Sequence, residues 1–389
     1  MSPSTDEPQV PRPFRVRGIT HILPPAEWPT RISEYDFALP PELIAQTPPA
    51  SRGDSRLLVI RREPQGGLPR FEDLSFGDLP ALAKSENLQR SKWVRNRTQV
   101  FEARLYTKRP TGSEHEIVLV REIGDRRWQC IVRNSKRFDY PQRLHLRDNP
   151  EILLSSPEPG VIEFDTSGPS IYEICREYGE MPLPPYIKNR DKARDRDRYQ
   201  SVWAQQARPQ SVAAPTASLH FSDALCTELA ACGVNFVDIE LDVGLGTFEP
   251  LRFDEIHANE LHTERFALRA EARGQLESQI RADEPILCVG TTALRCLESL
   301  TLGGEASRAA QLVESPDGGW AGETKIFIKP GNSVLYTSQL LTNFHLPQSS
   351  LFVLVSTFAG SPTLAREAYD HAVRQGYRFF SYGDATLWL

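Results

Sequence analysis

Apolar residues follow two different patterns along the chain. Up to residue 164, short runs rich in β-branched residues recur at close spacing, as in antiparallel strands. They predict strands at 56–60, 98–106, 116–121, 128–133 and 160–164, with a short helix at 41–45 before them. The regular spacing from 98 to 164 predicts a small β-barrel.

From residue 170 onward, apolar runs of helical length alternate with runs of strand length. This alternation predicts a mainly parallel sheet with helices on its faces, because parallel strands need long crossover connections. The predicted helices are 170–179, 195–206, 222–232, 264–280, 292–301 and 363–375. The predicted strands are 234–243, 285–290, 325–328, 350–356 and 377–381.

The two patterns together predict an α/β fold with an inserted antiparallel β-barrel. We assign residues 31–84 and 166–389 to the α/β domain and residues 85–165 to the barrel. Residues 1–30 are rich in proline, serine and charge, which is typical of a flexible extension. The mixed-charge run 189–198 is interpreted as the solvated start of a helix.

Composition limits the range of functions. The chain has 389 residues, 40% of them hydrophobic, and a net charge of −6. With no overall positive charge to attract nucleic acid, an RNA contact requires a local basic patch. No apolar run approaches the ~20 residues that span a bilayer, and none resembles a signal-peptide core. The six cysteines include no Cys-x-x-Cys pair, which favours reduced thiols and a cytoplasmic protein.

Two loop motifs are typical of a small-molecule pocket in an α/β enzyme. A loop interrupted by Pro215 ends at His220, and a glycine turn follows the predicted strand 234–243. Glycines let the backbone approach a ligand, although an ordinary tight turn explains them equally well. The substrate-binding candidates in these motifs are Ala214, Pro215, Thr216, Phe221, Gly244, Gly246 and Thr247.

A third motif is a strand, a glycine turn and a helix around Gly290-Thr291-Thr292. The unpaired N–H groups of a helix N-terminus and two hydroxyls can bind a carboxylate, but a simple threonine cap is the alternative. Arg295, on the same helix, can hold a carboxylate or pair with Glu298.

Three histidines are candidate catalytic residues, although isolated histidines are usually structural. Glu264 follows His262 closely enough to orient it. No spacing typical of metal ligands is present, so we predict no metal site. The catalytic candidates are His220, His345, His262, Glu264 and Asp242.

A basic stretch from Arg90 continues into the first predicted barrel strand, with aromatic residues between the charges. Such a stretch can contact phosphates and stack on bases. Alternatively, the aromatic side chains face a core and the charges are merely solvated. The candidates for RNA or acceptor contact are Arg56, Arg95, Arg97, Arg104 and Lys108.

Many ordered motifs give the chain a family resemblance from Tyr35 to its C-terminus. It resembles the S-adenosylmethionine:tRNA ribosyltransferase-isomerases, the QueA family of the queuosine pathway. The matching stretches include 55–58, 103–105, 181–187, 198–200, 213–216, 219–221, 290–292, 330–331, 342–347 and 377–384.

The resemblance implies an α/β domain with an inserted barrel that acts on S-adenosylmethionine. In this family, the ribosyl part of S-adenosylmethionine is moved and isomerised onto 7-aminomethyl-7-deazaguanine in tRNA to give epoxyqueuosine, and adenine and methionine leave. The alternative is a diverged member that cleaves or rearranges S-adenosylmethionine, or modifies a small metabolite, without tRNA. A catalytically silent binding protein is a further alternative.

The implied chemistry assigns roles to several candidates. The sulfonium acidifies the C5′ hydrogens, so His220 or His345 can act as the base. Thr291, Thr292 and Arg295 would anchor the methionine carboxylate, and Asn343 and Asp384 would position the substrate. Thr342 and Tyr382 lie in the same matching stretches. The chain departs from the family pattern at Arg97, Gln99, Ser218, Glu240, Asp242 and Asn259.

Overall fold

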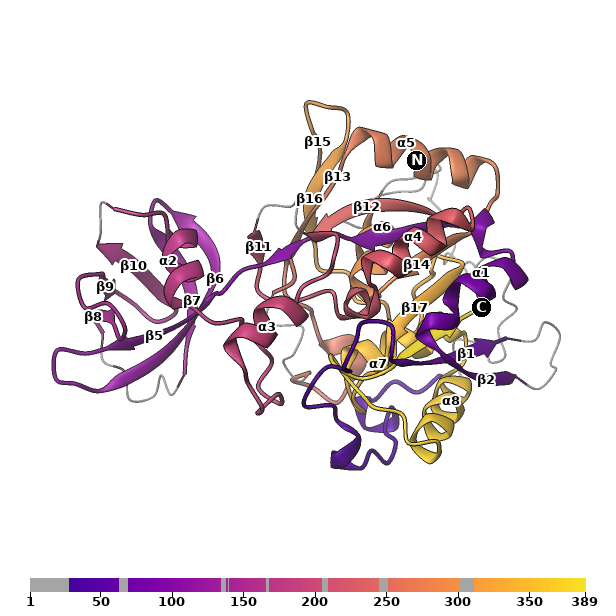
Figure 1. The fold of residues 1–389 in the computed structure, drawn as a ribbon, viewed down its shortest axis with the longest axis horizontal. Coiled ribbons are helices and arrows are strands. Elements are labelled where there is room, and N and C mark those ends of the chain that lie inside the picture. The colour runs from indigo at the N-terminus through magenta and orange to yellow at the C-terminus, as the bar shows by residue number, and fades with distance from the viewer. Residues whose placement is uncertain are drawn as a thin grey trace, which may run out of the picture.

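The computed structural model describes residues 28–62, 69–133, 138, 140–165, 168–204, 209–244, 251–300 and 311–389. Within them, the chain forms an α/β body and a β-barrel that lie side by side (Figure 1). The predicted fold class is confirmed. Gly246, Thr247 and most of the N-terminal extension lie outside the described residues.

A mixed sheet forms the centre of the α/β body. In spatial order, its described strands are β15 (Gln311–Glu314), β16 (Trp320–Thr324), β13 (Glu264–Leu268), β12 (Asn235–Leu241), β3 (Lys92–Asn96), β14 (Ile286–Val289), β17 (Gln339–Asn343), β18 (Ala385–Trp388), β1 (Arg56–Arg61) and β2 (Arg70–Ser75). The central strands β12, β3, β14 and β17 are parallel. The predicted parallel character holds for this centre, whereas both edges of the sheet are antiparallel.

Helices cover both faces of the sheet. Strand β1 is apolar throughout because both of its faces are buried. Its side chains alternate, so Leu58 and Ile60 pack in the core on one face of the sheet, and Leu57 and Val59 pack in the core on the other. On the first face lie α5 (Ala270–Arg281), α6 (Thr291–Ser299), α7 (Ser350–Ala359) and α8 (Pro362–Arg374). On the second face lie α1 (Leu79–Ser85) and α4 (Asp223–Ala231). None of the described helices is long and apolar enough to cross a membrane.

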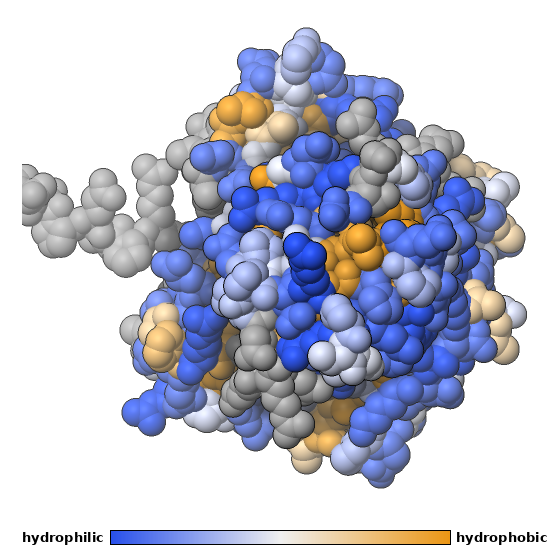
Figure 2. Space-filling model, turned by 90° about the vertical axis from the view of Figure 1, so that its left-hand side faces the viewer, coloured by the Kyte–Doolittle hydropathy of each residue, from blue (hydrophilic) through white to orange (hydrophobic). Residues whose placement is uncertain are grey.

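The barrel is closed and antiparallel. Around its circumference run β10 (Val161–Asp165), β7 (Arg127–Val132), β6 (Glu114–Gly124), β5 (Arg104–Lys108), β8 (Gln142–Leu146) and β9 (Leu153–Ser156). Helix α2 (Ile171–Tyr178) adds Ile174 and Cys175 to the barrel core. The barrel begins later than the predicted residue 85, because Trp93 and Val94 lie in the cores of the central sheet. Seen from the barrel end, the surface is mostly hydrophilic, with small hydrophobic patches (Figure 2).

Short elements connect the two parts. Helix α3 (Lys192–Arg198) lies where the barrel meets the α/β body (Figure 1). Strands β4 (Gln99–Val100) and β11 (Pro209–Ser211) pair with each other beside it. The described 3-10 helices are η2 (Ile32–Glu34), η3 (Pro41–Leu43), η4 (Phe76–Asp78), η5 (Leu88–Arg90), η8 (Thr216–His220) and η10 (Ile256–Ala258).

Several predicted elements were wrong. The run predicted as a strand at 350–356 is helix α7, because the Ser349 side chain caps its first turn and Gly360 ends it with a φ of 74°. Residues 264–268 form strand β13 before helix α5 begins. The strands predicted at 325–328 and 377–381 are absent from these described segments, and neighbouring strands β16 and β18 form instead.

Candidate active site

A pocket lies at the carboxyl ends of the parallel strands, where open α/β sheets generally bind ligands. Its wall comes from the ends of β12, β14 and β17, from η8, from the start of α7 and from the turn before β18. The lining residues are Ala214, Pro215, Thr216, Ala217, Val243, Gly290, Thr291, Thr292, Thr342, Asn343, His345, Leu351, Phe380 and Ser381. The described wall therefore contains hydroxyls, one amide and one imidazole, and no carboxylate, lysine or arginine.

His345 lines this pocket directly and is almost completely buried. Its Nε2 atom lies 3.2 Å from the hydroxyl of Thr342, and its backbone N–H donates to the hydroxyl of Tyr369. Burial lowers the pKa of His345 to about 3. The imidazole is therefore neutral at physiological pH, with an unprotonated ring nitrogen.

His220 lies behind the wall rather than on it. Its Nδ1 atom is 2.7 Å from the Ser55 hydroxyl, and its ring stacks on Phe76 at a centroid distance of 4.9 Å. Burial lowers the pKa of His220 to about 4, while the Asn343 side chain, as a hydrogen-bond partner, acts in the opposite direction. Neither His220 Nε2 nor Asn343 Oδ1 makes a well-formed hydrogen bond within the described residues. The Asn343 side chain therefore lies near His220 and also lines the pocket, whereas His220 itself does not line it.

The N-terminus of α6 forms another part of the wall. Gly290 has a φ of 91° and a ψ of 156°, a region that only glycine adopts without strain. This conformation brings Thr291 and Thr292 to the pocket at the positive end of the helix. The Thr292 hydroxyl is buried and has no hydrogen-bond partner among the described residues. The predicted anion site thus has an available donor.

The structure brings most of the predicted binding residues together but moves several of them away from the pocket. Phe221 packs in the core, with Trp203 and Phe76 against its ring. Asp384 accepts hydrogen bonds from the backbone N–H groups of Arg56 and Arg378, and therefore stabilises the turn before β18. Tyr382 and Gly244 are likewise outside the lining set.

Arg295 does not face the pocket. Its guanidinium forms a buried ion pair with Glu264, and its Nε donates to the Ile326 carbonyl at 3.2 Å. Glu298 instead accepts hydrogen bonds from the backbone at residues 335–337, so the predicted Arg295–Glu298 pair does not form. To hold a substrate carboxylate as predicted, Arg295 would need a free guanidinium, but its guanidinium is paired with Glu264.

His262 is also away from the pocket. Its side chain is exposed and lines a separate surface pocket with Phe253 and Lys325. Glu264 is directed to Arg295 and to the backbone N–H of Gly244, so it does not orient His262 as predicted.

Asp242 lies one residue before the pocket wall at the end of β12. The Thr98 hydroxyl donates to its carboxylate at 3.2 Å. Burial raises the pKa of Asp242 to about 6, and the nearby carboxylates of Glu240 and Glu264 act in the same direction. Its side chain can therefore exchange a proton near neutral pH.

All five predicted RNA contacts are neutralised by carboxylates. The ion pairs are Arg56–Asp73, Arg95–Asp238, Arg97–Glu240, Arg104–Glu116 and Lys108–Glu114. The aromatic residues between them pack inward, because Trp93 and Phe101 are buried. The interpretation of these aromatic side chains as core residues is therefore confirmed.

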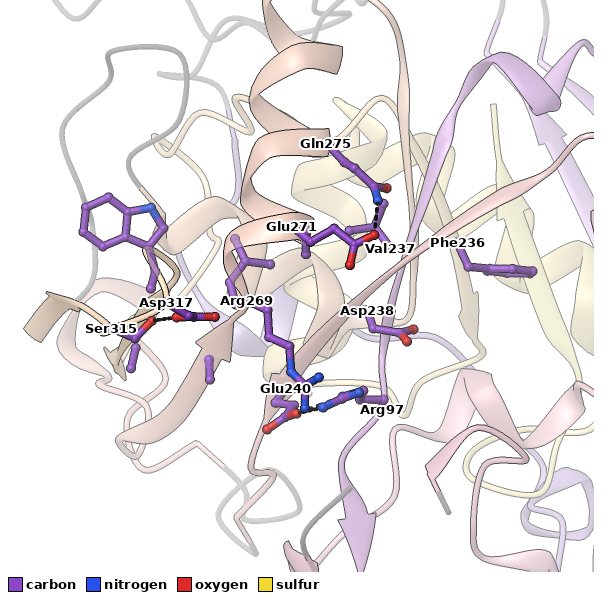
Figure 3. Close-up of a pocket in the computed structure, with 15 residues that line it drawn as sticks. Arg97, Phe236, Val237, Asp238, Glu240, Arg269, Glu271, Gln275, Ser315 and Asp317 are labelled. Atoms are coloured by element: carbon purple, nitrogen blue, oxygen red, sulfur yellow. Dashed lines mark hydrogen bonds and ion pairs between the residues drawn. The ribbon is translucent and has the colours of Figure 1, made fainter. Parts of the chain in front are cut away.

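Arg97 and Glu240 both line a surface groove of about 330 Å³ beside α5. Their side chains meet in an ion pair, as Figure 3 shows. Arg97 and Glu240 are both departures from the family pattern. Arg97 directly follows β3 and Glu240 lies on β12, and the pairing of these strands brings the two residues together. The carboxylate of Glu240 therefore compensates the charge of Arg97.

Sequence reasoning missed five pocket residues. They are Ala217, Val243, Leu351, Phe380 and Ser381. Phe380 has a φ of 76°, which is unusual for a side chain of this size and marks a constrained backbone. Phe380 lies in the matching stretch 377–384, and this was the feature of the sequence that could have identified it as a pocket residue. Among the described residues, no His, Cys, Asp and Glu side chains form a group that could hold a metal ion.

Comparisons with known proteins agree with the resemblance. The sequence matches the family described as queuosine biosynthesis protein over residues 32–388. It is 39% identical over 362 residues to an S-adenosylmethionine:tRNA ribosyltransferase-isomerase of Cupriavidus pinatubonensis, covering 92% of this chain and 98% of the relative. A protein of the same name from Aromatoleum aromaticum is 40% identical over 358 residues, covering 92% of this chain and 96% of the relative.

One solved structure, of an S-adenosylmethionine tRNA ribosyltransferase from Thermotoga maritima, is 28% identical with a TM-score of 0.49. The match covers 92% of this chain and 100% of that one. The family match spans nearly the whole α/β body and barrel, and the two relatives are covered almost completely. The chain belongs to the queuosine biosynthesis protein family.

Proposed function

We propose that this chain is an S-adenosylmethionine:tRNA ribosyltransferase-isomerase. It would transfer and isomerise the ribosyl moiety of S-adenosylmethionine onto 7-aminomethyl-7-deazaguanine in tRNA, giving epoxyqueuosine, adenine and methionine. Curated relatives that match over almost their whole length carry this name. The observation that carries the proposal is one pocket to which four matching stretches contribute, with a neutral histidine in its wall.

The pocket suits a substrate with a positive sulfur and a carboxylate. Its described wall has no cationic side chain that would repel a sulfonium. The methionine carboxylate would bind at the N-terminus of α6, where Thr291 and Thr292 supply hydroxyls and the helix supplies backbone N–H groups. Leu351 and Phe380 add the apolar surface on which a purine can pack.

We assign the base to His345. A sulfonium weakens the adjacent C5′–H bond, so a positioned base can remove the proton. Because His345 is neutral, its imidazole can lie beside the sulfonium without charge repulsion. Thr342 fixes the ring through Nε2. His220 would act as a positioning residue, since Asn343 stands between it and the pocket.

Adenine release tests the proposal. The protein is incubated with S-adenosylmethionine, with and without tRNA that carries the aminomethyl base, and adenine is quantified by chromatography. We expect release only when the tRNA is present. Release without tRNA would support cleavage or rearrangement of S-adenosylmethionine alone, and binding without release would support a silent relative. Either outcome contradicts the proposal.

The His345→Gln variant tests the base. Glutamine keeps a polar side chain but cannot take up the proton, so turnover should fall at least about 100-fold. Affinity for S-adenosylmethionine, measured by calorimetry, should change only a few-fold. His220→Gln is the comparison, and its smaller effect should be shared by Asn343→Ala. Equal turnover of His345→Gln and the unmodified protein would remove His345 from the mechanism.

A further inference from the structure

The segment Lys188–Arg198, here called the basic segment, concentrates positive charge in an acidic chain. It contains six lysines and arginines against three aspartates, whereas the whole chain has a net charge of −6. The segment includes helix α3, which lies where the barrel meets the α/β body (Figure 1). It therefore borders both parts of the molecule.

Residues within and beside the basic segment connect it to the pocket wall through hydrogen bonds and ring packing. The Tyr186 hydroxyl forms a hydrogen bond with Ser381, and the Tyr186 ring packs on Phe380 at a centroid distance of 4.1 Å. Both partners line the pocket. Asp195, inside the segment, is 3% exposed and accepts a hydrogen bond from Tyr382. The charges of the segment are thus held at a fixed place next to the pocket.

Carboxylates neutralise only part of the described segment, since Arg194 pairs with Asp195 and Arg196 pairs with Glu102. Asp191 caps α3 by accepting from the backbone of Arg194, and Asp195 is turned inward to Arg194 and Tyr382. Among the described residues, Lys188, Arg190 and Lys192 form no ion pair. Lys188 and Lys192 are exposed.

Arg198, at the end of the segment, and Arg52, beside it, form hydrogen bonds to carbonyls rather than to carboxylates. Arg198 donates to the carbonyl of Ala50, and Arg52 donates to the carbonyls of Asp197 and Leu219. Carbonyl contacts orient a guanidinium without cancelling its charge. Arg198 is also close enough to Arg52 to contribute to lowering its pKa, although burial is the larger cause.

We propose that the basic segment, with Arg52, binds the phosphate backbone of the tRNA whose base enters the pocket. This inference rests on the proposed function. Phosphate contacts position a nucleic acid on a protein without reading its sequence, and they need cations that are not already paired. The five arginines and lysines predicted from sequence are paired with carboxylates, whereas Lys188, Arg190 and Lys192 of the basic segment form no ion pair among the described residues.

Binding of tRNA as a function of salt tests the inference. The variant Lys188→Ala/Arg190→Ala/Lys192→Ala should lose at least about tenfold in tRNA affinity, and the slope of log K against log salt should become shallower by about 2 to 3. Its affinity for S-adenosylmethionine should be unchanged. The matched control is Lys84→Ala/Arg90→Ala/Arg281→Ala, which removes the same charge from α1, η5 and α5. We expect less than about a twofold change for the control.

Lysine acetylation of the unmodified protein gives a second readout that needs no variant. Bound tRNA should protect Lys188 and Lys192 from the reagent and leave Lys84 reactive. An unchanged salt slope in the triple variant, or reactive Lys188 and Lys192 in the complex, overturns the inference while the proposed function stands. If the unmodified protein binds no tRNA, both are overturned.

Discussion

Removal of one partner from the buried ion pair between Arg295 and Glu264 should destabilise the folded protein by several kcal/mol. Both side chains are 4% exposed. Arg295 lies on α6 and Glu264 on β13, so the pair joins a helix of the core to the antiparallel edge of the sheet. Glu264 also accepts a hydrogen bond from the backbone of Gly244 at 3.3 Å.

The perturbation is Arg295→Met, which keeps the apolar stem but removes the charge. Glu264 would then be a buried carboxylate without its arginine, and the Ile326 carbonyl would lose its donor. Removal of one partner from a buried pair typically costs about 3 to 5 kcal/mol. In Glu264→Gln/Arg295→Met no charge remains, so the double variant should be more stable than Arg295→Met alone.

Urea unfolding followed by tryptophan fluorescence measures these free energies. The control is Arg273→Met on α5, where Arg273 and its partner Glu277 are 26% and 20% exposed. An ion pair of this kind is worth less than about 1 kcal/mol. A loss below about 1 kcal/mol for Arg295→Met, or a double variant weaker than the single one, would refute the reasoning.

Three other predictions follow from single residues. The pKa of Asp242 in the fold, about 6, lies above its unfolded value of about 3.9, so its contribution to stability is full below pH 4 and is lost as the pH rises through 6. The free energy of unfolding of Asp242→Asn, relative to that of the unmodified protein, should therefore rise by about 2 kcal/mol between pH 4 and pH 7. The same difference at both pH values in urea unfolding would contradict this. Arg62 donates to three carbonyls, at 2.8, 3.0 and 3.1 Å. Arg62→Ala should therefore lower the free energy of unfolding by about 2 to 4 kcal/mol in the same assay. An unchanged free energy of unfolding would show that water replaces those donors. In Gly290→Ala, the new Cβ would lie 3.4 Å from the Cβ of Ala217, on a backbone conformation that is strained for alanine. Calorimetry should therefore show at least about tenfold weaker binding of S-adenosylmethionine. Unchanged affinity would show that the turn relaxes.

The fold class was predictable because each layer leaves a periodic signal. The barrel strands are short and closely spaced, and helices alternate with strands afterwards. Local ambiguity caused the errors. The buried run in α7 is apolar on all sides, so its periodicity does not distinguish helix from strand, and only Ser349 and Gly360 mark its ends. Strand β3 was hidden because Lys92 and Arg95 flank its buried residues.

The pocket was largely predictable, and the charged residues around it were not. Glycines, prolines and threonines in matching stretches reveal a local backbone shape, which the sequence encodes directly. The partner of an arginine depends on contacts between distant segments, such as Arg295 with Glu264 or Arg97 with Glu240. The short sequence separation favoured Glu298 as the ion-pair partner of Arg295, whereas in the folded structure Glu264 is the partner.

The position of β18 has a consequence for biosynthesis. This strand pairs with both β17 and β1, so among the described strands the hairpin β1–β2 is joined to the rest of the sheet through β18 and the adjoining Leu389. On a ribosome, the hairpin would wait roughly 15 to 60 seconds for those residues at typical elongation rates. The barrel, closed by local antiparallel contacts, can form during that interval. A nascent chain that stalls late would therefore present a finished barrel beside an unprotected strand edge, a state that depends on chaperones.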